Sequence, residues 1–459
     1  MATNSIGNKK YNHTVVIGGS IAGLLTARVL ANYFQQVTIV EHDRLDEKTI
    51  ERAGVPQSHH VHALLTQGQR LLEQLFPGIN DDLDAAGAPK VNWTADFLFL
   101  GLFGWFPRFP GDLVTRTVSR QLLENIVRKH LKNYPNVQFI TPAKVTGFLT
   151  NSNQTHITGI CFSSNNTTKT LTAELVVDAS GRNSQTPKWL ESLGYPQPQE
   201  TIVNSFLGYA SRWYQAPEDF RSDWKVLMMS YSPYETTKGG VIYQIENNCW
   251  IVTMAGIAKD YPPTDEAGFL EFVRHLRNPI IYETIKDAQP LSSIYGYRRT
   301  ENRWRHYEKL PKFPEGLAVL GDAVCAFNPI YGQGMTVAAL GAFTLDQCLH
   351  ESQSLTGFGK RFQKRLAKIN QVPWLIATGE DFRWSTTEGG QPNLITKLMH
   401  RYLDLVIQLS VESPQVYQVF LEVLHLVKSP NALFQPYILL RAIKQAISNQ
   451  FSAIKNNPI

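Results

Sequence analysis

The feature that most constrains the fold is a glycine-rich turn between two apolar segments near the start of the chain. Residues 14–17 (TVVI) lead into the turn 18–23 (GGSIAG), which is followed by an apolar helical pattern and then by residues 37–40 (VTIV), with Glu41 at their end. This order of strand, turn, helix, strand and acid is typical of the βαβ unit that binds an adenine dinucleotide. We therefore expect an α/β domain with a dinucleotide site at the turn.

Each part of the turn has a physical reason. Gly18 and Gly23 leave room for the backbone to approach a diphosphate, and the first N–H groups of the helix offer that anion a partial positive charge. Ser20 stands where the pattern usually has its middle glycine. Glu41 is placed to accept the ribose hydroxyls and would repel a 2′-phosphate. The alternative is an ordinary βαβ turn that binds nothing.

Periodicity divides the whole chain into four segments. Residues 1–200 read as the first part of the dinucleotide domain, with a β-meander inserted between about 137 and 178. Residues 201–310 carry short β-rich runs, with a hairpin turn at 246–248, and predict an antiparallel-sheet substrate domain. Residues 311–355 return to the first domain, and residues 356–459 are mostly helical. The expected class is α/β (α+β overall), with a Rossmann-like domain, a substrate domain and a helical C-terminal segment.

Composition limits the partners. The hydrophobic fraction of 43% and charged fraction of 18% are ordinary for a globular protein. Four scattered cysteines predict neither a disulfide framework nor a zinc site, and with a polar N-terminus they favour the cytoplasm. The net charge of +5 lies in residues 356–459, and it is too dilute for nucleic acid. A helical cap over the substrate domain is the simpler interpretation of that segment, and peripheral contact with an anionic membrane is the other.

Two later segments make the pattern specific. One is the buried run 175–178 (LVVD), ending at Asp178 and a glycine turn, and the other is 317–335, which contains Gly321-Asp322-Ala323 and ends in NPIYGQGM. Together with the first turn, they resemble the FAD-dependent single-component (group A) monooxygenases, which include para-hydroxybenzoate hydroxylase and squalene epoxidase. The resemblance runs from Thr14 to Arg441. Within the superfamily, the Arg-x-Gly-Val-Pro-Gln segment at Arg52 looks most like the polyene epoxidases of polyether biosynthesis.

The resemblance implies FAD as the cofactor. A carboxylate at a strand end, Asp322, is placed to accept hydrogen bonds from the ribityl chain, and the helix beginning near Gly332 would face the flavin edge that becomes negative on reduction. By the family's pattern, Arg52 and Arg120 also contact FAD. The expected cofactor-binding residues are Gly18, Ser20, Gly23, Glu41, Arg52, Arg120, Asp178, Asp322, Pro329, Gly332, Gly334 and Met335. No metal site is expected.

The implied chemistry is the insertion of one oxygen atom from O2 into a hydrophobic substrate through a flavin C4a-hydroperoxide, which requires water to be excluded. Epoxidation of a polyene or isoprenoid is favoured, and hydroxylation is next. His60 and His62 are the candidate catalytic residues, through hydrogen bonds to flavin or substrate or as a proton donor. The aromatic run from Trp93 to Phe109 reads equally as pocket or as core.

Departures from the family pattern leave the electron donor and the reaction open. Asp178-Ala179 stands where many aromatic hydroxylases have Asp-Gly, so NAD(P)H or a separate reductase partner could deliver the electrons. The Trp-x-Trp-x-Ile-Pro motif of flavin halogenases is absent, which disfavours halogenation. The rivals are an FAD-dependent C=C reductase of the geranylgeranyl reductase type and a non-catalytic FAD-binding scaffold.

Overall fold

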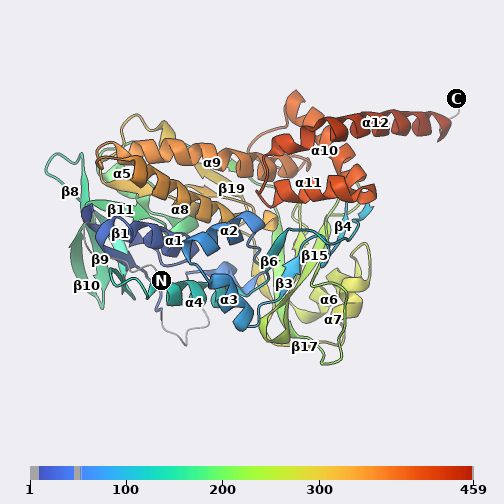
Figure 1. Ribbon diagram of the computed structural model, residues 1–459, viewed down its shortest axis with the longest axis horizontal. Coiled ribbons are helices and arrows are strands. Elements are labelled where there is room, and N and C mark those ends of the chain that lie inside the picture. The colour runs from blue at the N-terminus through green and yellow to red at the C-terminus, as the bar shows by residue number, and fades with distance from the viewer. Residues whose placement is uncertain (1–9, 46–51, 53, 457–459) are drawn as a thin grey trace.

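The computed structural model describes residues 10–45, 52 and 54–456. The polar residues 1–9 and Ala53 of the Arg-x-Gly segment, both considered in the sequence, lie outside the described residues. The described chain combines a parallel sheet, several antiparallel sheets and a group of C-terminal helices (Figure 1). This confirms the expected fold class.

A five-stranded parallel sheet forms the centre of the first domain. Its strands, in spatial order, are β20 (Leu317–Val319), β11 (Leu175–Asp178), β1 (Tyr11–Ile17), β2 (Phe34–Val40) and β7 (Val137–Ile140). Val15 and Val16 of β1 are fully buried, as expected for a parallel sheet covered on both faces. Because parallel strands end at one edge, this sheet brings the turns after β1, β11 and β20 together.

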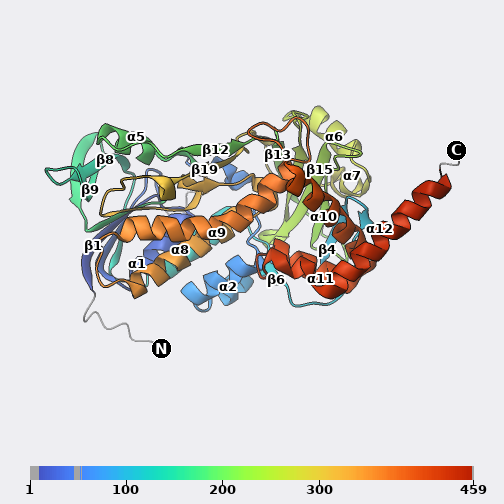
Figure 2. The same cartoon turned by 90° about the horizontal axis from the view of Figure 1, so that it is seen from above.

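Helices cover this sheet and connect its strands. They are α1 (Ile21–Leu30), α2 (Thr66–Leu75), α3 (Ile79–Ala85), α4 (Arg120–Leu131), α5 (Thr186–Ser192), α8 (Gly334–Glu351) and α9 (Phe358–Asp381). Helix α8 packs against α1, α2 and α9, and it runs beside α9 in both views (Figures 1 and 2).

The inserted meander is an antiparallel sheet of β8 (Lys144–Thr150), β9 (Ile157–Ser164) and β10 (Thr167–Thr172). The sequence placed its start near residue 137, but that run forms β7, which pairs in parallel with β2. Small sheets join β3 (Lys90–Asn92) to β6 (Val114–Arg116), and β12 (Glu200–Val203) and β21 (Cys325–Ala326) to β19 (Asn302–Arg305).

The larger sheet carries the predicted hairpin between β15 (Lys238–Ile245) and β16 (Cys249–Gly256), which the strand pairing confirms. Its other strands are β13 (Gly208–Gln215), β14 (Val226–Met229), β17 (Gln289–Pro290), β18 (Tyr295–Tyr297), β4 (Phe97–Gly101) and β5 (Gly104–Trp105). Helices α6 (Glu266–Arg274) and α7 (Ile280–Ile285) accompany it. The sheet therefore takes β4 and β5 from within residues 1–200.

The C-terminal helices α10 (Leu394–Glu412), α11 (Pro414–Leu424) and α12 (Pro436–Asn456) gather at the end of the molecule where β4 and β15 lie (Figure 1). Helix α12 extends away from the body in both views (Figures 1 and 2). None of the helices in the described part of the chain combines the length and the hydropathy of a membrane span.

Candidate functional site

The turn after β1 is built around two glycines that no larger residue could replace. Gly18 has a φ of +103°, and a Cβ placed on it would lie 2.7 Å from the carbonyl oxygen of Ala179, which follows β11. A Cβ on Gly23 would lie 1.8 Å from the carbonyl oxygen of Gly18. The turn is therefore closely packed, and the backbone N–H groups at the start of α1 form a ready-made site for an anion.

The Glu41 carboxylate lies directly beside this turn. Its Oε2 accepts a hydrogen bond from the Gly19 N–H at 2.5 Å and an ion pair from Arg52 Nη2 at 2.9 Å, and its Oε1 accepts from the Asp43 N–H at 2.8 Å. A carboxylate offers about four acceptor sites. These three donors use most of them, His42 Nδ1 also lies 3.5 Å from Oε1, and the ribose hydroxyl stays the partner predicted for Glu41 from sequence.

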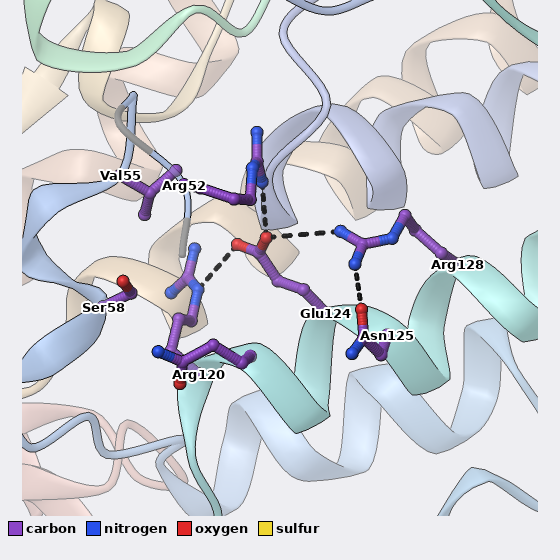
Figure 3. A pocket seen from close by; sticks show the side chains of 8 residues that line it. Arg52, Val55, Ser58, Arg120, Glu124, Asn125 and Arg128 are labelled. Atoms are coloured by element: carbon purple, nitrogen blue, oxygen red, sulfur yellow. Dashed lines mark hydrogen bonds and ion pairs between the residues drawn. The ribbon is translucent and has the colours of Figure 1, made fainter. Parts of the chain in front are cut away.

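A buried carboxylate that the sequence analysis did not identify lies at the centre of an arginine cluster. Glu124 of α4 accepts hydrogen bonds from Arg52 Nη1 at 2.6 Å, from Arg120 Nε at 2.8 Å and from Ser20 Oγ at 2.5 Å, and Arg128 Nη1 lies 3.6 Å away (Figure 3). Burial alone would raise the pKa of Glu124, but Arg120 and Arg52 outweigh it and lower the pKa to about 2. Glu124 therefore carries a negative charge at neutral pH and orients the predicted FAD contacts.

The local sequence explains how α4 presents this cluster. Ser119 caps the helix, because its Oγ accepts the Leu122 N–H at 3.2 Å, and Arg120 and Glu124 are four residues apart on one face. That spacing was the signal available in the sequence. The pairing with Ser20, whose Oγ also accepts a hydrogen bond from Arg120 Nη2 at 2.9 Å, depends on the tertiary fold.

Asp178 has a different set of partners from the predicted one. The side chain is fully buried, and it accepts hydrogen bonds from the Ser180 N–H and Oγ, from Ser184 Oγ and from Thr186 Oγ1, at 2.5 to 2.9 Å. Both carboxylate oxygens are thus already used within the protein. The structural role of Asp178 is to hold the turn after β11 in place.

The Asp322 carboxylate is close to both helix starts. Gly321, with a φ of +63°, packs against Ala22 of α1, and a Cβ on Gly334 at the start of α8 would lie 4.0 Å from Asp322 Oδ1. Among the described residues, the Asp322 side chain makes no hydrogen bond. Burial raises its pKa, which the positive charges of Arg182 and Arg120 oppose. The geometry leaves Asp322 free to accept hydrogen bonds from a polyol.

The segment from Asn328 to Met335 turns sharply before α8. A short 3-10 turn begins at Pro329, and Gly332 follows in the left-handed region with a φ of +64°, where its α-carbon faces the methyl group of Ala63. Met335 is buried in the first turn of α8. Helix α8 begins at Gly334, close to the start expected near Gly332, and its first residue lies beside Asp322; the contact of its N–H groups with the flavin edge stays a prediction.

The loop from residue 60 to residue 65 joins this region to the larger sheet. His60 Nδ1 lies 2.7 Å from Ser211 Oγ of β13, and Ser211 bonds to Thr253 of β16 at 2.6 Å. At the other end, the Leu65 N–H donates to Thr336 Oγ1 of α8 at 3.2 Å. A single short loop thus connects the start of α8 with the interior of the substrate sheet.

The two predicted histidines are neutral at physiological pH. Burial, with the nearby His62 and His59, lowers the pKa of His60 to about 3. Burial and the charge of Arg120 lower the pKa of His62 to about 4, and its Nδ1 donates to the His60 carbonyl at 2.8 Å. Hydrogen bonding, rather than donation of a proton from an imidazolium, is the role that this environment favours.

A second buried acid, also missed in the sequence, lies behind the Asn328–Tyr331 segment. Asp381, at the end of α9, is fully buried and accepts hydrogen bonds from Asn302 Nδ2 at 2.6 Å, Tyr331 OH at 2.9 Å and Asn328 Nδ2 at 3.2 Å. Burial raises its pKa to about 7, against the opposing effect of these donors. Asp381 fixes the segment before α8 to the end of α9.

The aromatic run forms a core. Phe97, Phe99 and Phe106 stack in series, and Phe106 stacks on Tyr417 of α11 with ring centroids 4.5 Å apart. Trp93 is also buried and donates to Thr115. These side chains therefore bind the C-terminal helices to the larger sheet, which favours the core interpretation for most of the run.

The structure brings most of the predicted residues to one region, and Asp178 adjoins it through its strand partner Ile17, while its carboxylate bonds within its own turn. The turn at Gly18, Ser20 and Gly23 meets Glu41, Arg52 and Arg120, and the Asp322 segment adjoins it through Ala22 and the start of α8. His60 and His62 lie in the loop 60–65, which is hydrogen-bonded to α8 through Leu65. The direct cofactor contacts of these residues stay predictions.

Comparison with known proteins gives a family and a fold. The sequence profile of the family described as "FAD binding domain" matches residues 11–361. Protein Rv3254 of Mycobacterium tuberculosis is 32% identical over 400 residues, which cover 84% of each chain.

Solved structures share the fold at low sequence identity. A flavoprotein/dehydrogenase from Cytophaga hutchinsonii has a TM-score of 0.67 at 16% identity, covering 96% of this chain and 99% of its own. The myxobacterial chondrochloren halogenase CndH has a TM-score of 0.62 at 17% identity, covering 93% and 97%. PqsL of Pseudomonas aeruginosa, a probable FAD-dependent monooxygenase, has a TM-score of 0.61 at 15% identity, covering 81% and 97%.

Proposed function

The chain belongs to the FAD binding domain family of group A flavoproteins and is an FAD-dependent oxidoreductase of the monooxygenase type; from this premise we propose that it inserts one oxygen atom from O2 into a hydrophobic substrate. Epoxidation of a polyene or isoprenoid alkene is the favoured reaction, and hydroxylation is the next. The observation that carries the proposal is the loop 60–65, which connects the start of α8 to the substrate sheet.

The residues of the turn region fit FAD. The N–H groups at the start of α1 and the guanidinium of Arg120 would hold the diphosphate, Glu41 the adenosine ribose, and Asp322 the ribityl chain. The unbonded carboxylate of Asp322 supports this assignment, because a half-buried acid without a hydrogen-bond donor is costly unless a ligand supplies one.

When bound and reduced, FAD would supply the two electrons that activate O2, and O2 itself would supply the inserted oxygen atom. The protein's task is to exclude water and to place the substrate. Neutral His60 is enclosed by Tyr209 and Tyr297, with ring centroids at 5.0 and 5.7 Å, and its neighbour His59 stacks on Tyr295 at 3.9 Å. This aromatic surround offers an apolar wall for an alkene and contributes no charge near neutral pH.

The electron donor is part of the proposal. Asp178 holds its own turn, and Ala179, which stands where many aromatic hydroxylases have Gly, contacts Gly18. We expect a separate reductase to be the better donor, with direct reduction by NAD(P)H slow. Halogenase neighbours share the fold only, and this sequence lacks the halogenase tryptophan motif.

Stopped-flow absorbance tests the proposal. The purified flavoprotein is reduced with dithionite and mixed with O2, with and without a squalene-like isoprenoid. We expect a transient absorbing species before the oxidised spectrum returns, and a product carrying one atom of ¹⁸O from ¹⁸O2. Single-step reoxidation under both conditions contradicts the proposal.

The same preparation separates the rivals. Saturation of the alkene without O2 identifies a C=C reductase, and a bound flavin that no donor reduces identifies a non-catalytic scaffold. A hydrophobic substrate also favours a protein that works against a lipid surface.

A further inference from the structure

Exposed apolar side chains are concentrated in the C-terminal helices. Of the fifteen large apolar residues that are exposed in the described part of the chain, nine lie between residues 394 and 447. They are Leu394, Ile395, Leu398 and Met399 of α10, Phe434, and Tyr437, Leu440, Ile443 and Ile447 of α12. A globular surface rarely exposes apolar side chains in such a local group without a partner.

Helix α12 carries two apolar faces, and only one of them is covered. Ile438 and Ala442 are buried in a cluster with Val406 and Val416 of the neighbouring helices. On the other face, Leu440, Ile443 and Ile447 are 68%, 58% and 50% exposed. Their spacing of three and four residues places them, with Tyr437, in one stripe, and α12 projects from the body so that the stripe is accessible (Figure 2).

The charges that α12 itself carries have one sign, and the nearby acid Glu422 of α11, whose charge acts on Tyr437, is paired with Lys428 at 2.6 Å. Residues 436–456 contain no Asp or Glu, and Arg441 and Lys444 of α12 are exposed next to the stripe. At the start of α10, the exposed Lys397 and Arg401 accompany its apolar residues in the same way. An apolar stripe on a helix whose own charges are all cations matches an anionic lipid surface, which takes the side chains into its acyl boundary and the cations among its headgroups.

We propose that the exposed face of α12 docks on an anionic phospholipid membrane. A second copy of the chain fits the same face less well, because α12 carries cations such as Arg441 and Lys444 and no acid, so a second α12 offers them no opposite charge. The proposal concerns a surface remote from the arginine cluster and does not depend on the reaction.

Vesicle sedimentation tests the proposal with the full-length flavoprotein. Vesicles of phosphatidylcholine alone are compared with vesicles containing phosphatidylglycerol, at low and high salt. We expect binding to the anionic vesicles that weakens with salt. The triple variant Leu440→Ser, Ile443→Ser, Ile447→Ser should lose at least about a hundredfold in partitioning, since each side chain loses its apolar burial. Lys444→Gln should lose about fivefold, the effect of one cation near an anionic surface.

The matched control is Ile202→Ser with Leu291→Ser, two exposed apolar residues far from α12, the first in β12 and the second directly after β17. This control should bind vesicles as the unmodified protein does, and all variants should retain flavin and circular dichroism. Lack of binding to anionic vesicles overturns the proposal, as does equal binding by the triple variant. A dimer in light scattering that the triple variant abolishes, without vesicle binding, would assign the face to a second copy instead.

Discussion

Replacing Glu124 with glutamine tests the arginine cluster directly. The substitution keeps the size and shape of the side chain but removes the negative charge that faces Arg52, Arg120 and Arg128. It also turns an amide N–H₂ toward donors that have no other acceptor at that position. We expect FAD-free Glu124→Gln to be markedly less stable than the unmodified protein at neutral pH.

The size of the effect follows from the pKa of Glu124. A drop from 4.5 to about 2 is about 2.5 pKa units, or about 3 kcal/mol at ~1.36 kcal/mol per unit. Because the folded-state pKa is depressed, this stability is present above about pH 4.5 and is lost as the pH falls toward 2. Removing one partner of a buried ion pair costs about 3–5 kcal/mol, which agrees with this figure.

Urea unfolding, followed by circular dichroism and intrinsic fluorescence, measures the change. Glu351→Gln is the control, because that acid pairs with Arg365 on the surface at 2.6 Å and should produce no measurable shift. Added FAD should raise the midpoint of Glu124→Gln more than that of the unmodified protein, because the diphosphate restores negative charge beside the arginines. An unchanged midpoint in FAD-free Glu124→Gln would refute the role assigned to Glu124.

Three further outcomes follow from the site. Asp322→Ala should lose flavin during purification, and retention of full yellow colour in its absorbance spectrum would contradict the ribityl assignment. Because the pKa of Asp381 is raised, the folded state should lose up to about 4 kcal/mol of stability as the pH rises from about 4 to 7. In Asp381→Asn, the urea midpoint should therefore change less with pH over that range. If the midpoint changes equally with pH in both proteins, Asp381 is not the cause. His62→Gln should not change the pH dependence of the reaction between the reduced protein and O2 from about pH 5 to 8, because the His62 imidazole is already neutral there. If an inflection in the pH profile disappears in the variant, His62 gains or loses a proton in that range.

Local patterns in the sequence were sufficient to predict the parallel sheet and its turns. A buried strand followed by a glycine turn occurs at β1, β11 and β20, with acids at the ends of β2 and β11 and after β20, and parallel strands bring such turns to one edge regardless of what lies between them. The hairpin at 246–248 is likewise a local signal. The local pattern did not reveal that the Asp178 carboxylate bonds to Ser180, Ser184 and Thr186 of its own turn, and its contact with FAD stays a prediction.

The residues that the sequence did not reveal depend on distant contacts. Asp381 stands in an ordinary helical stretch, and its donors come from residues 302, 328 and 331. The aromatic run at 93–109 could not be assigned to core or pocket because its stacking partner Tyr417 lies more than 300 residues along the chain. Strand β7 was misplaced into the meander because a four-residue apolar run does not specify its partner.

A crystal structure of the FAD complex tests the central claim most directly. We expect the diphosphate within hydrogen-bond distance of the N–H groups after Gly18 and of Arg120, and the ribityl hydroxyls bonded to Asp322, with the flavin between the start of α8 and the loop 60–65. FAD bound elsewhere, or bound with Asp322 still unbonded, would contradict the account.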